Sequence, residues 1–291
     1  MNAPVPSSVF ISGPDGLRLH ARCYGRRSAA TLPVLCLPGL ARTAADFELL
    51  AEALAGPHDR RVIALDYRGR GLSDYDRDPA NYSFQVEIAD VLAVATALEA
   101  LPAIFIGTSR GGILTMLLGA LRPTAIAGVV LNDIGPVIEP KGLMRIKGYV
   151  GKLPQPRNYE EAAEILRRLF DAQFPKLTHD EWLTSAHRTF KEQNGALVPV
   201  YDVNLAKTME GIDFERPLPP LWAQFDALRH VPLMAIRGAN SDLLSAETVT
   251  AMRSRRDAME TLEIPDQGHA PLLAEADTIA RIAAFVASCA P

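Results

Sequence analysis

The chain has 291 residues, a formal net charge of −4 at pH 7, and 48% hydrophobic against 22% charged residues. This length is enough for one large domain, with or without an insertion, and for a sizeable apolar core. The slightly acidic balance and the lack of a basic run argue against nucleic acid or an anionic membrane surface as a partner. Composition alone therefore predicts an ordinary globular protein.

The start of the chain and its cysteines bear on the cellular compartment. Residues 1–6 have neither a basic segment nor an apolar segment of the kind found in a secretory leader, and no apolar run is as long as a membrane span. The cysteine count is odd, with Cys23 and Cys36 inside predicted strands and Cys289 in the tail. We therefore expect no disulfide framework and a cytoplasmic protein.

Taken in chain order, short apolar runs alternate with segments of helical periodicity. Gly13 to Gly16 is a hairpin signal between the first two runs, and Asp46 and Ser83 are candidate helix caps. The predicted strands are 9–11, 17–21, 32–37, 61–65, 103–106, 126–131, 231–236 and 261–264. The predicted helices outside the middle of the chain are 46–54, 84–98, 113–118 and 278–286. This alternation predicts an α/β fold with a mostly parallel, doubly wound sheet.

The middle of the chain breaks this alternation. Between 137 and 230 there is no convincing buried strand, and three helical segments are separated by proline and glycine. These segments are 159–170, 180–190 and 221–228. We expect a helical cap over the sheet edge, inserted between core segments 1–136 and 231–291. Trp182 and Trp222 both fall in this insertion and are expected to be core residues rather than ligand contacts.

The stretch 103–118 combines a strand, a sharp turn and a helix. The turn, 107–112, reads Gly-Thr-Ser-Arg-Gly-Gly and has Ser109 at its tip. Strand, Gly-x-Ser-x-Gly and helix together define a nucleophile elbow, in which Cβ atoms two residues either side of the serine would collide with neighbouring backbone. The alternative is a glycine-rich turn whose serine only caps the helix. The flanking strand and helix favour the elbow.

A nucleophilic serine needs a base and an orienting acid, and the second half of the chain supplies candidates. His269 follows the last predicted strand in a Gly-His loop, and Asp242 follows the strand before it. The order Ser109, Asp242, His269 is the chain order expected of an α/β-hydrolase. His269 could instead be a solvated loop residue, and Asp242 could be a helix cap. Asp133, at the end of the strand after the elbow, is the strongest rival acid; Asp266 is too near His269 along the chain.

With these motifs the chain resembles α/β-hydrolase-fold proteins that carry a helical cap. The resemblance covers nearly all of the chain and rests on the elbow at 107–112, the loop 66–73, the turn 238–242 and Gly268-His269. It implies that Ser109 attacks the substrate, that His269 transfers the proton, and that Asp242 fixes the imidazole tautomer.

The same resemblance implies an oxyanion hole made of two backbone N–H groups. They would be those of Arg110, just after the nucleophile, and Leu40, in the loop after the second main strand. Relatives usually carry His-Gly at that strand end, whereas this chain has Pro38-Gly39. Because the donor is a backbone group the hole can form, but the loop must be braced differently.

The resemblance implies a serine hydrolase that cleaves a small carboxylic ester or lactone through an acyl-enzyme. The sequence shows no metal cluster and no phosphate-binding glycine loop, so we expect neither cofactor nor metal. A runner-up is a C–C bond hydrolase of the meta-cleavage-product type, in which Arg110 or Arg42 would hold a substrate carboxylate. The other interpretation of Arg110 is a pair with a surface acid. A different class, a ligand-binding or sensor protein of low turnover, also occurs on this fold. The expected partner is a small-molecule substrate, and the oligomeric state stays open.

Overall fold

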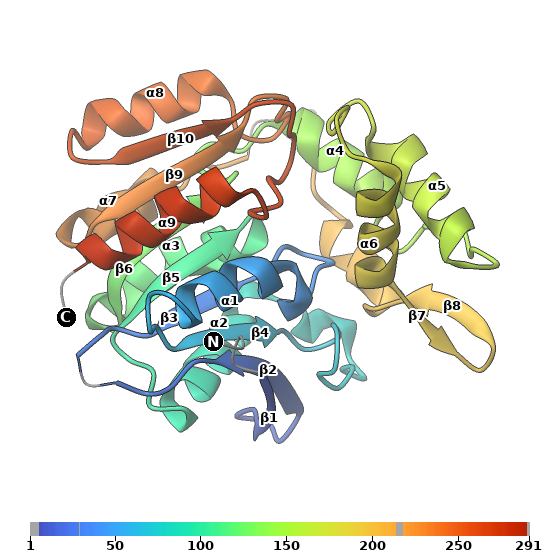
Figure 1. Cartoon of the computed structure of the whole chain (residues 1–291), viewed down its shortest axis with the longest axis horizontal. Coiled ribbons are helices and arrows are strands. Elements are labelled where there is room, and N and C mark those ends of the chain that lie inside the picture. Colours follow the sequence, from blue (N-terminus) through green and yellow to red (C-terminus); the bar gives the residue numbers. More distant parts are fainter. Residues whose placement is uncertain (1–5, 29, 214–217, 290–291) are drawn as a thin grey trace.

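The computed structural model describes residues 6–28, 30–213 and 218–289. The expectation that residues 1–6 are not a secretory leader falls almost entirely outside the described residues. An eight-stranded sheet in the order β1-β2-β4-β3-β5-β6-β9-β10 forms the centre of the molecule (Figure 1). Its strands are β1 (Ser7–Ser12), β2 (Arg18–Tyr24), β3 (Val34–Leu37), β4 (Val62–Asp66), β5 (Ala103–Thr108), β6 (Ile126–Asn132), β9 (Leu233–Gly238) and β10 (Glu260–Ile264). Strand β2 pairs antiparallel with both β1 and β4. From β4 to β10 along the sheet order, neighbouring strands run parallel to one another. The predicted doubly wound sheet is confirmed.

Helices cover both faces of this sheet because their apolar residues recur at helical spacing. Two apolar clusters, one on each face, hold the layers together. One face packs against α1 (Glu48–Ala55) and α9 (Ala276–Ser288); the other packs against α2 (Phe84–Ala97), α3 (Arg110–Leu121), α7 (Trp222–Ala227) and α8 (Ala246–Arg255). Short 3₁₀ helices complete the chain: η1 (Ala44–Phe47), η2 (Pro79–Asn81), η3 (Pro123–Ala125), η4 (Val203–Met209) and η5 (Leu228–His230).

Most of the segment between β6 and β9 forms a separate layer beside the sheet (Figure 1). It contains α4 (Pro140–Tyr149), α5 (Tyr159–Phe170), α6 (His179–Thr189) and a hairpin of β7 (Phe190–Gln193) and β8 (Ala196–Pro199). The expectation of helices alone is therefore wrong for the hairpin. Its turn is Asn194-Gly195, with φ of 54° and 76°, which is a strong short-range hairpin signal. Each strand has only four residues, too few for an alternating pattern to stand out.

This layer has an apolar core of its own. Trp182, 5% exposed, packs there with residues of α5, α6 and the hairpin, so it is a core residue of this layer as expected. It also lines the cavity that contains Ser109, so the expectation that it makes no ligand contact stays a prediction. By contrast α7 packs on α3 under the sheet, and Phe225 and Leu228 join the main core. Trp222 is half-buried there, with the Arg255 guanidinium 4.3 Å from its ring. We therefore propose a cap that ends before Trp222 rather than at residue 230.

The two predicted helix caps differ in outcome. Ser83 accepts a hydrogen bond from the Val86 N–H at the start of α2, as expected. Asp46 does not cap its helix: the chain enters through η1, whose cap is Thr43, and the Asp46 carboxylate binds Arg42.

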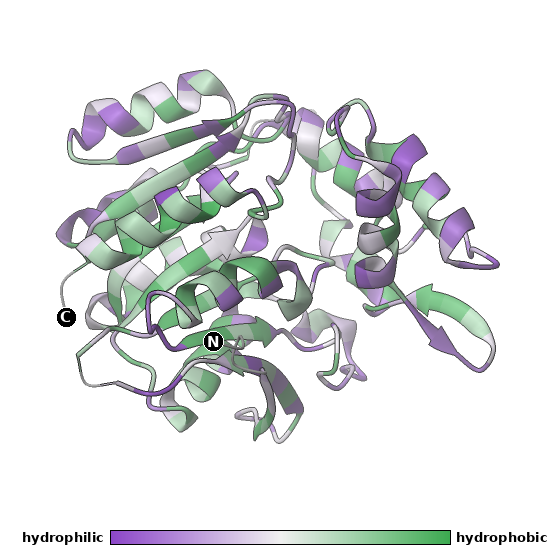
Figure 2. Ribbon diagram, in the orientation of Figure 1, coloured by the Kyte–Doolittle hydropathy of each residue, from purple (hydrophilic) through white to green (hydrophobic). Residues whose placement is uncertain are grey.

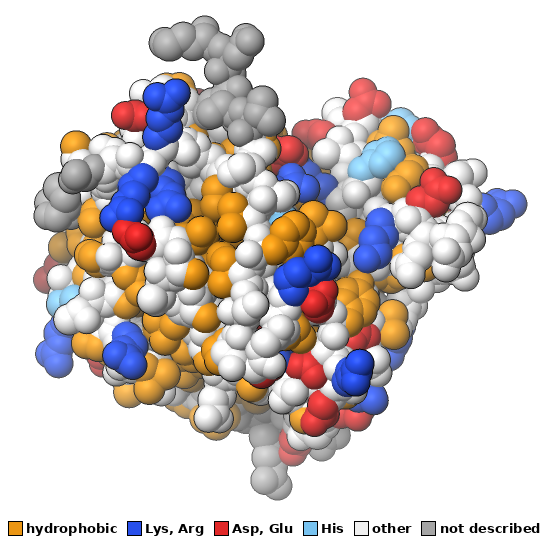
Figure 3. Space-filling view, turned by 90° about the horizontal axis from the view of Figure 1, so that it is seen from below, with side chains coloured by type: hydrophobic (Ala, Val, Ile, Leu, Met, Phe, Trp, Pro, Cys, Tyr) orange, Lys and Arg blue, Asp and Glu red, His pale blue; other side chains and the backbone are white. Residues whose placement is uncertain are grey.

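Hydrophobic residues are concentrated in the inner strands, whereas α5 and α8 carry many hydrophilic ones (Figure 2). The face below the view of Figure 1 shows hydrophobic side chains between charged groups of both signs (Figure 3). Within residues 6–28, 30–213 and 218–289, no helix has the length and apolar character needed to cross a bilayer.

Candidate active site

The turn between β5 and α3 has the strained geometry expected of an elbow. Ser109 has φ 51° and ψ −113°, a backbone conformation that L-residues rarely adopt. A Cβ at Gly107 would lie 2.6 Å from the Gly111 carbonyl carbon, and one at Gly111 would lie 2.1 Å from the Leu37 carbonyl oxygen. Ser109 makes no side-chain cap hydrogen bond, so the interpretation as a helix cap does not hold. The sequence argument about the glycines is confirmed.

Three side chains from separate segments form a continuous hydrogen-bonded line. Ser109 Oγ lies 2.8 Å from His269 Nε2, and His269 Nδ1 lies 2.8 Å from Asp133 Oδ2. A carboxylate only accepts, so Nδ1 carries the proton and Nε2 is left to accept from the serine hydroxyl. The imidazole and the carboxylate are 6% and 0% exposed, which shields both from water.

Asp133 directly follows β6, and its carboxylate is held by β9, the neighbouring strand. Its Oδ1 accepts from the Gly238 N–H at 2.8 Å, and its Oδ2 accepts from Ser241 Oγ at 2.5 Å. The histidine loop is fixed as well, because the His269 N–H donates to Gln173 Oε1 at 2.9 Å. Gln173 lies between α5 and α6, so the layer beside the sheet contacts the base directly. No motif in the sequence pointed to it.

Asp242 is not the partner of the histidine, and this prediction is corrected. Its two carboxylate oxygens accept from Arg145 Nε and Nη2 at 2.7 and 2.8 Å. Burial raises the pKa of Asp242, but hydrogen bonds from Arg145 and Gln173, together with the attraction of Arg145 and His269, outweigh it and lower that pKa below its usual value. The Asp242 carboxylate thus binds Arg145 of α4, whereas the rival acid, Asp133, forms the hydrogen bond with the His269 imidazole.

The residues of the two predicted oxyanion donors, Leu40 and Arg110, are both close to the serine. Arg110 opens α3, and the first N–H groups of a helix have no acceptor within it. The loop of Leu40 is adjacent, since a Cβ built on Gly39 would be 3.9 Å from the Ser109 Cβ. Tyr67 Oη donates to the Pro38 carbonyl at 3.2 Å and so braces the start of this loop.

Ser109, His269 and Leu40 open into a cavity of about 510 Å³. The loop after β3 and the loop after His269 form part of its wall, and the layer between β6 and β9 supplies most of the rest. The apolar wall residues from that layer are Ile146, Tyr149, Val150, Leu153, Leu166, Phe170, Phe174, Leu177 and Trp182. A cavity of this size and lining fits a small, largely apolar molecule.

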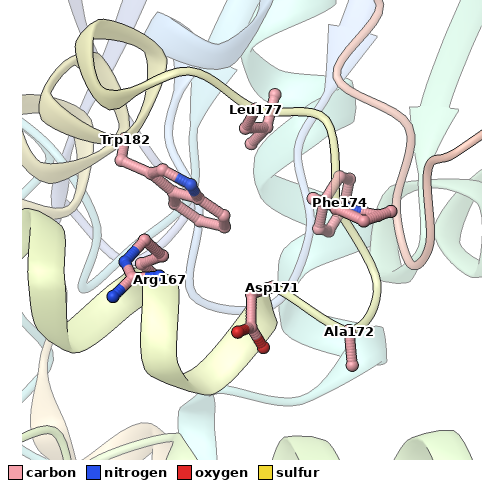
Figure 4. Close-up of a pocket in the computed structure, with 7 residues that line it drawn as sticks. Arg167, Asp171, Ala172, Phe174, Leu177 and Trp182 are labelled. Carbon is pink, nitrogen blue, oxygen red and sulfur yellow. The ribbon is translucent and has the colours of Figure 1, made fainter.

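A second pocket of about 440 Å³ lies on the same layer (Figure 4). Arg167 and Asp171 lie at its edge, while Phe174, Leu177 and Trp182 form its apolar wall. These three apolar residues also line the cavity of Ser109. The two pockets therefore share part of their walls.

Both arginines considered for a substrate carboxylate are paired with carboxylates of the protein itself. Arg42 donates from Nε and Nη2 to Asp46 at 2.7 and 2.6 Å, and from Nη1 to Thr189 at 3.0 Å. Arg110 donates from Nε to Glu87 at 2.6 Å. The partner of Arg110 is an acid, as the alternative interpretation held, but it is buried rather than at the surface.

A second serine–histidine–aspartate line occurs far from the elbow. Ser8 Oγ lies 3.1 Å from His20 Nε2, and His20 Nδ1 lies 2.7 Å from Asp66 Oδ2. Ser8 is exposed and lies within the edge strand β1, not at a turn from a strand into a helix. This cluster has the connectivity of a triad without a nucleophile elbow. In the described part of the chain, no group of three or more His, Cys, Asp or Glu side chains could hold a metal ion.

Comparison with known proteins bears on the family and fold of the chain. A model of the alpha/beta hydrolase family matches residues 34–282. The chain is similar to the 3-hydroxybutyrate-oligomer hydrolase of Cupriavidus necator, with 32% identity over 94% of this chain and 96% of that protein. The 2-(acetamidomethylene)succinate hydrolase of Mesorhizobium japonicum is 24% identical over 92% of each chain. The crystal structure of an alpha/beta hydrolase from Novosphingobium aromaticivorans matches with a TM-score of 0.89 and 39% identity, over 98% of this chain and 99% of that chain.

Proposed function

Because the chain belongs to the alpha/beta hydrolase family, we propose that it is a serine hydrolase that cleaves small carboxylic esters through an acyl-enzyme. The observation that carries this proposal is the line from Ser109 through His269 to Asp133, with 2.8 Å at both contacts. The strained elbow and the adjoining cavity supply the other requirements of nucleophilic catalysis.

In the proposed reaction, Ser109 Oγ adds to the ester carbonyl carbon while His269 Nε2 takes the hydroxyl proton. Asp133 holds the imidazole tautomer and stabilises the imidazolium. The N–H groups of Leu40 and Arg110 bind the oxyanion of the tetrahedral intermediate, each contributing about 3 kcal/mol. The intermediate collapses, His269 protonates the leaving alkoxide, and an alcohol departs. Water then attacks the acyl-enzyme through the same steps and releases the acid.

For the substrate we propose a short aliphatic oligoester, of which an oligomer of 3-hydroxybutyrate is the test case. The support is the similarity to a 3-hydroxybutyrate-oligomer hydrolase over nearly the whole chain and the apolar cavity of about 510 Å³. C–C bond cleavage of a diketo acid loses its main argument, because Arg42 and Arg110 both bind carboxylates of the protein itself.

The three cysteines support a reducing compartment, and we propose the cytoplasm. Cys23, Cys36 and Cys289 all have free thiols. Burial raises the pKa of Cys289 to about 11, so this thiol stays protonated and unreactive at neutral pH.

The test is incubation of the protein with dimers and trimers of 3-hydroxybutyrate, with p-nitrophenyl acetate, butyrate and octanoate as simpler esters. We expect release of the acids and, after rapid acid quenching, an acyl adduct on the peptide that contains Ser109. A diketo acid serves as the comparison substrate. Turnover of the diketo acid without any ester would reject ester hydrolysis, and ester binding without acid release would indicate a sensor.

Replacement of Trp182 is expected to change chain-length preference, because its indole is part of the wall shared by the two pockets. Trp182→Leu should raise the octanoate-to-butyrate ratio of kcat/KM about tenfold, the effect of burying roughly two extra methylene groups. Trp222→Leu is the control, since Trp222 lies on α7 and lines neither pocket. An equal ratio in both variants would show that Trp182 does not limit the acyl pocket.

A further inference from the structure

A buried ion network lies behind the elbow. Glu87 of α2 accepts from Arg70 Nη1 at 2.7 Å through Oε1 and from Arg110 Nε at 2.6 Å through Oε2. Glu87 and Arg70 are 0% exposed, and Arg110 is 8% exposed. Burial raises the pKa of Glu87, but attraction to the two arginines outweighs it and holds that pKa below its usual value. The glutamate is therefore an anion between two cations.

Both ends of this network reach the candidate oxyanion hole. Arg70 Nε donates to the Leu40 carbonyl oxygen at 2.8 Å, which fixes the loop that carries the first donor. Arg110 carries the second donor on its own backbone, and its guanidinium is held by Glu87 and by the Tyr82 carbonyl at 2.9 Å. One glutamate thus connects the two backbone segments whose separation must match the oxyanion.

The network also has a charge imbalance. Two guanidinium groups share one carboxylate, which leaves one net positive charge buried behind Ser109. Burying unpaired charge is costly, and Arg70 Nη2 has no hydrogen-bond partner in the described structure. A negative charge that forms nearby during the reaction would offset part of this cost, and electrostatic interactions are strong where water is excluded.

We propose that Arg70, Glu87 and Arg110 are positioning residues that set the spacing of the oxyanion hole and keep a net positive charge behind it. This inference rests on the proposed function, because it assumes that Ser109 forms an oxyanion. The network is expected to stabilise the transition state rather than to strengthen substrate binding. Substitutions should therefore lower kcat and leave KM nearly unchanged.

The chain provides a matched control in the same loop and the same helix. Arg68 donates from Nε and Nη2 to the two oxygens of Asp90 at 2.6 and 2.7 Å, and from Nη1 to Asp15 and Asp76 at 2.8 and 2.6 Å. The pair of Arg68 and Asp90 is as buried as the network, at 1% and 2% exposure, but its side chains contact neither oxyanion residue. Substitutions at either Arg68 or Arg70 remove buried ion pairs and should lower stability. Only the substitution in the network, at Arg70, should also slow the chemical step.

The experiment compares Arg70→Met, Arg110→Met and Arg68→Met in steady-state hydrolysis of p-nitrophenyl butyrate. A second readout is the affinity for a trifluoromethyl ketone, whose carbonyl accepts Ser109 Oγ to give a hemiketal oxyanion while His269 takes the proton. We expect Arg70→Met to lower kcat about 100-fold with KM within about twofold, the size of losing one oxyanion donor. Affinity for the ketone should fall by a similar factor. Arg68→Met should unfold at lower temperature and keep kcat and ketone affinity within about twofold.

Two results would overturn the inference while the proposed function stands: equal loss of kcat in Arg70→Met and Arg68→Met, or a loss confined to KM. If Arg70→Met does not fold, Arg110→Met tests the inference instead. This variant leaves Glu87 and Arg70 as a neutral ion pair and so removes the net positive charge. It should lower kcat and ketone affinity about tenfold, and unchanged values would reject the inference. A wild-type protein that hydrolyses no ester and resists labelling of Ser109 by a fluorophosphonate would instead reject the proposed function.

Discussion

Ser109→Ala is expected to lower kcat for ester hydrolysis by about 10⁶-fold, the order observed when the nucleophile of such a triad is removed. The hydroxyl forms the covalent bond, and no neighbouring group in the line to His269 can replace it. His269→Ala should cause a loss of the same order, since an unassisted serine hydroxyl is a weak nucleophile. Because the two residues act as a unit, the double variant should lose little more. Initial rates with p-nitrophenyl butyrate and fluorophosphonate labelling measure both effects.

Ser8→Ala is the control for this experiment. Ser8 lies 3.1 Å from His20, so its side chain has a histidine partner much as Ser109 does. It lacks the strained turn and the helix N-terminus that would stabilise an oxyanion. We expect full activity and full labelling in Ser8→Ala. Activity that survives in Ser109→Ala, with the label on another residue, would contradict the proposed mechanism.

The elbow could be predicted from the sequence because its physics is local. A strand, a turn that needs glycine at fixed positions and a helix are all encoded within sixteen residues, 103–118. The steric demand is visible at Gly111, where any Cβ would lie against the Leu37 carbonyl. His269 was found for a similar reason, as it follows the last strand of a parallel sheet whose carboxyl ends meet at one edge.

The identity of the acid could not be settled from sequence because two aspartates follow adjacent strands. β6 and β9 pair in parallel, so Asp133 and Asp242 both leave the sheet at the same edge. The difference between them is that Asp242 binds Arg145. Arg145 lies 97 positions before Asp242, in a helix without a recognisable motif. Glu87 escaped prediction in the same way, since a glutamate in an amphipathic helix is ordinarily expected at the surface.

The choice of acid leads to the second large expected effect. Asp133→Asn should lower kcat about 10⁴-fold, the order that follows when the orienting carboxylate of a triad becomes an amide. An asparagine can still accept from the Gly238 N–H through its oxygen, which leaves its NH₂ group facing His269 Nδ1. The imidazole would then carry its proton on Nε2 and could not accept one from Ser109. The fold should persist because the amide matches the carboxylate in size.

Asp242→Asn is the matched control, made at the same edge of the sheet. It removes the ion pair with Arg145, so we expect a loss of about 2 kcal/mol in the free energy of unfolding, the size of a hydrogen bond to a charged group. Its kcat should stay within about threefold of wild type, because the line from Asp133 to Ser109 is intact. Steady-state kinetics and urea unfolding of both variants separate the two roles. The reverse pattern, with activity lost only in Asp242→Asn, would return Asp242 to the triad and make the contact of Asp133 with His269 a structural one.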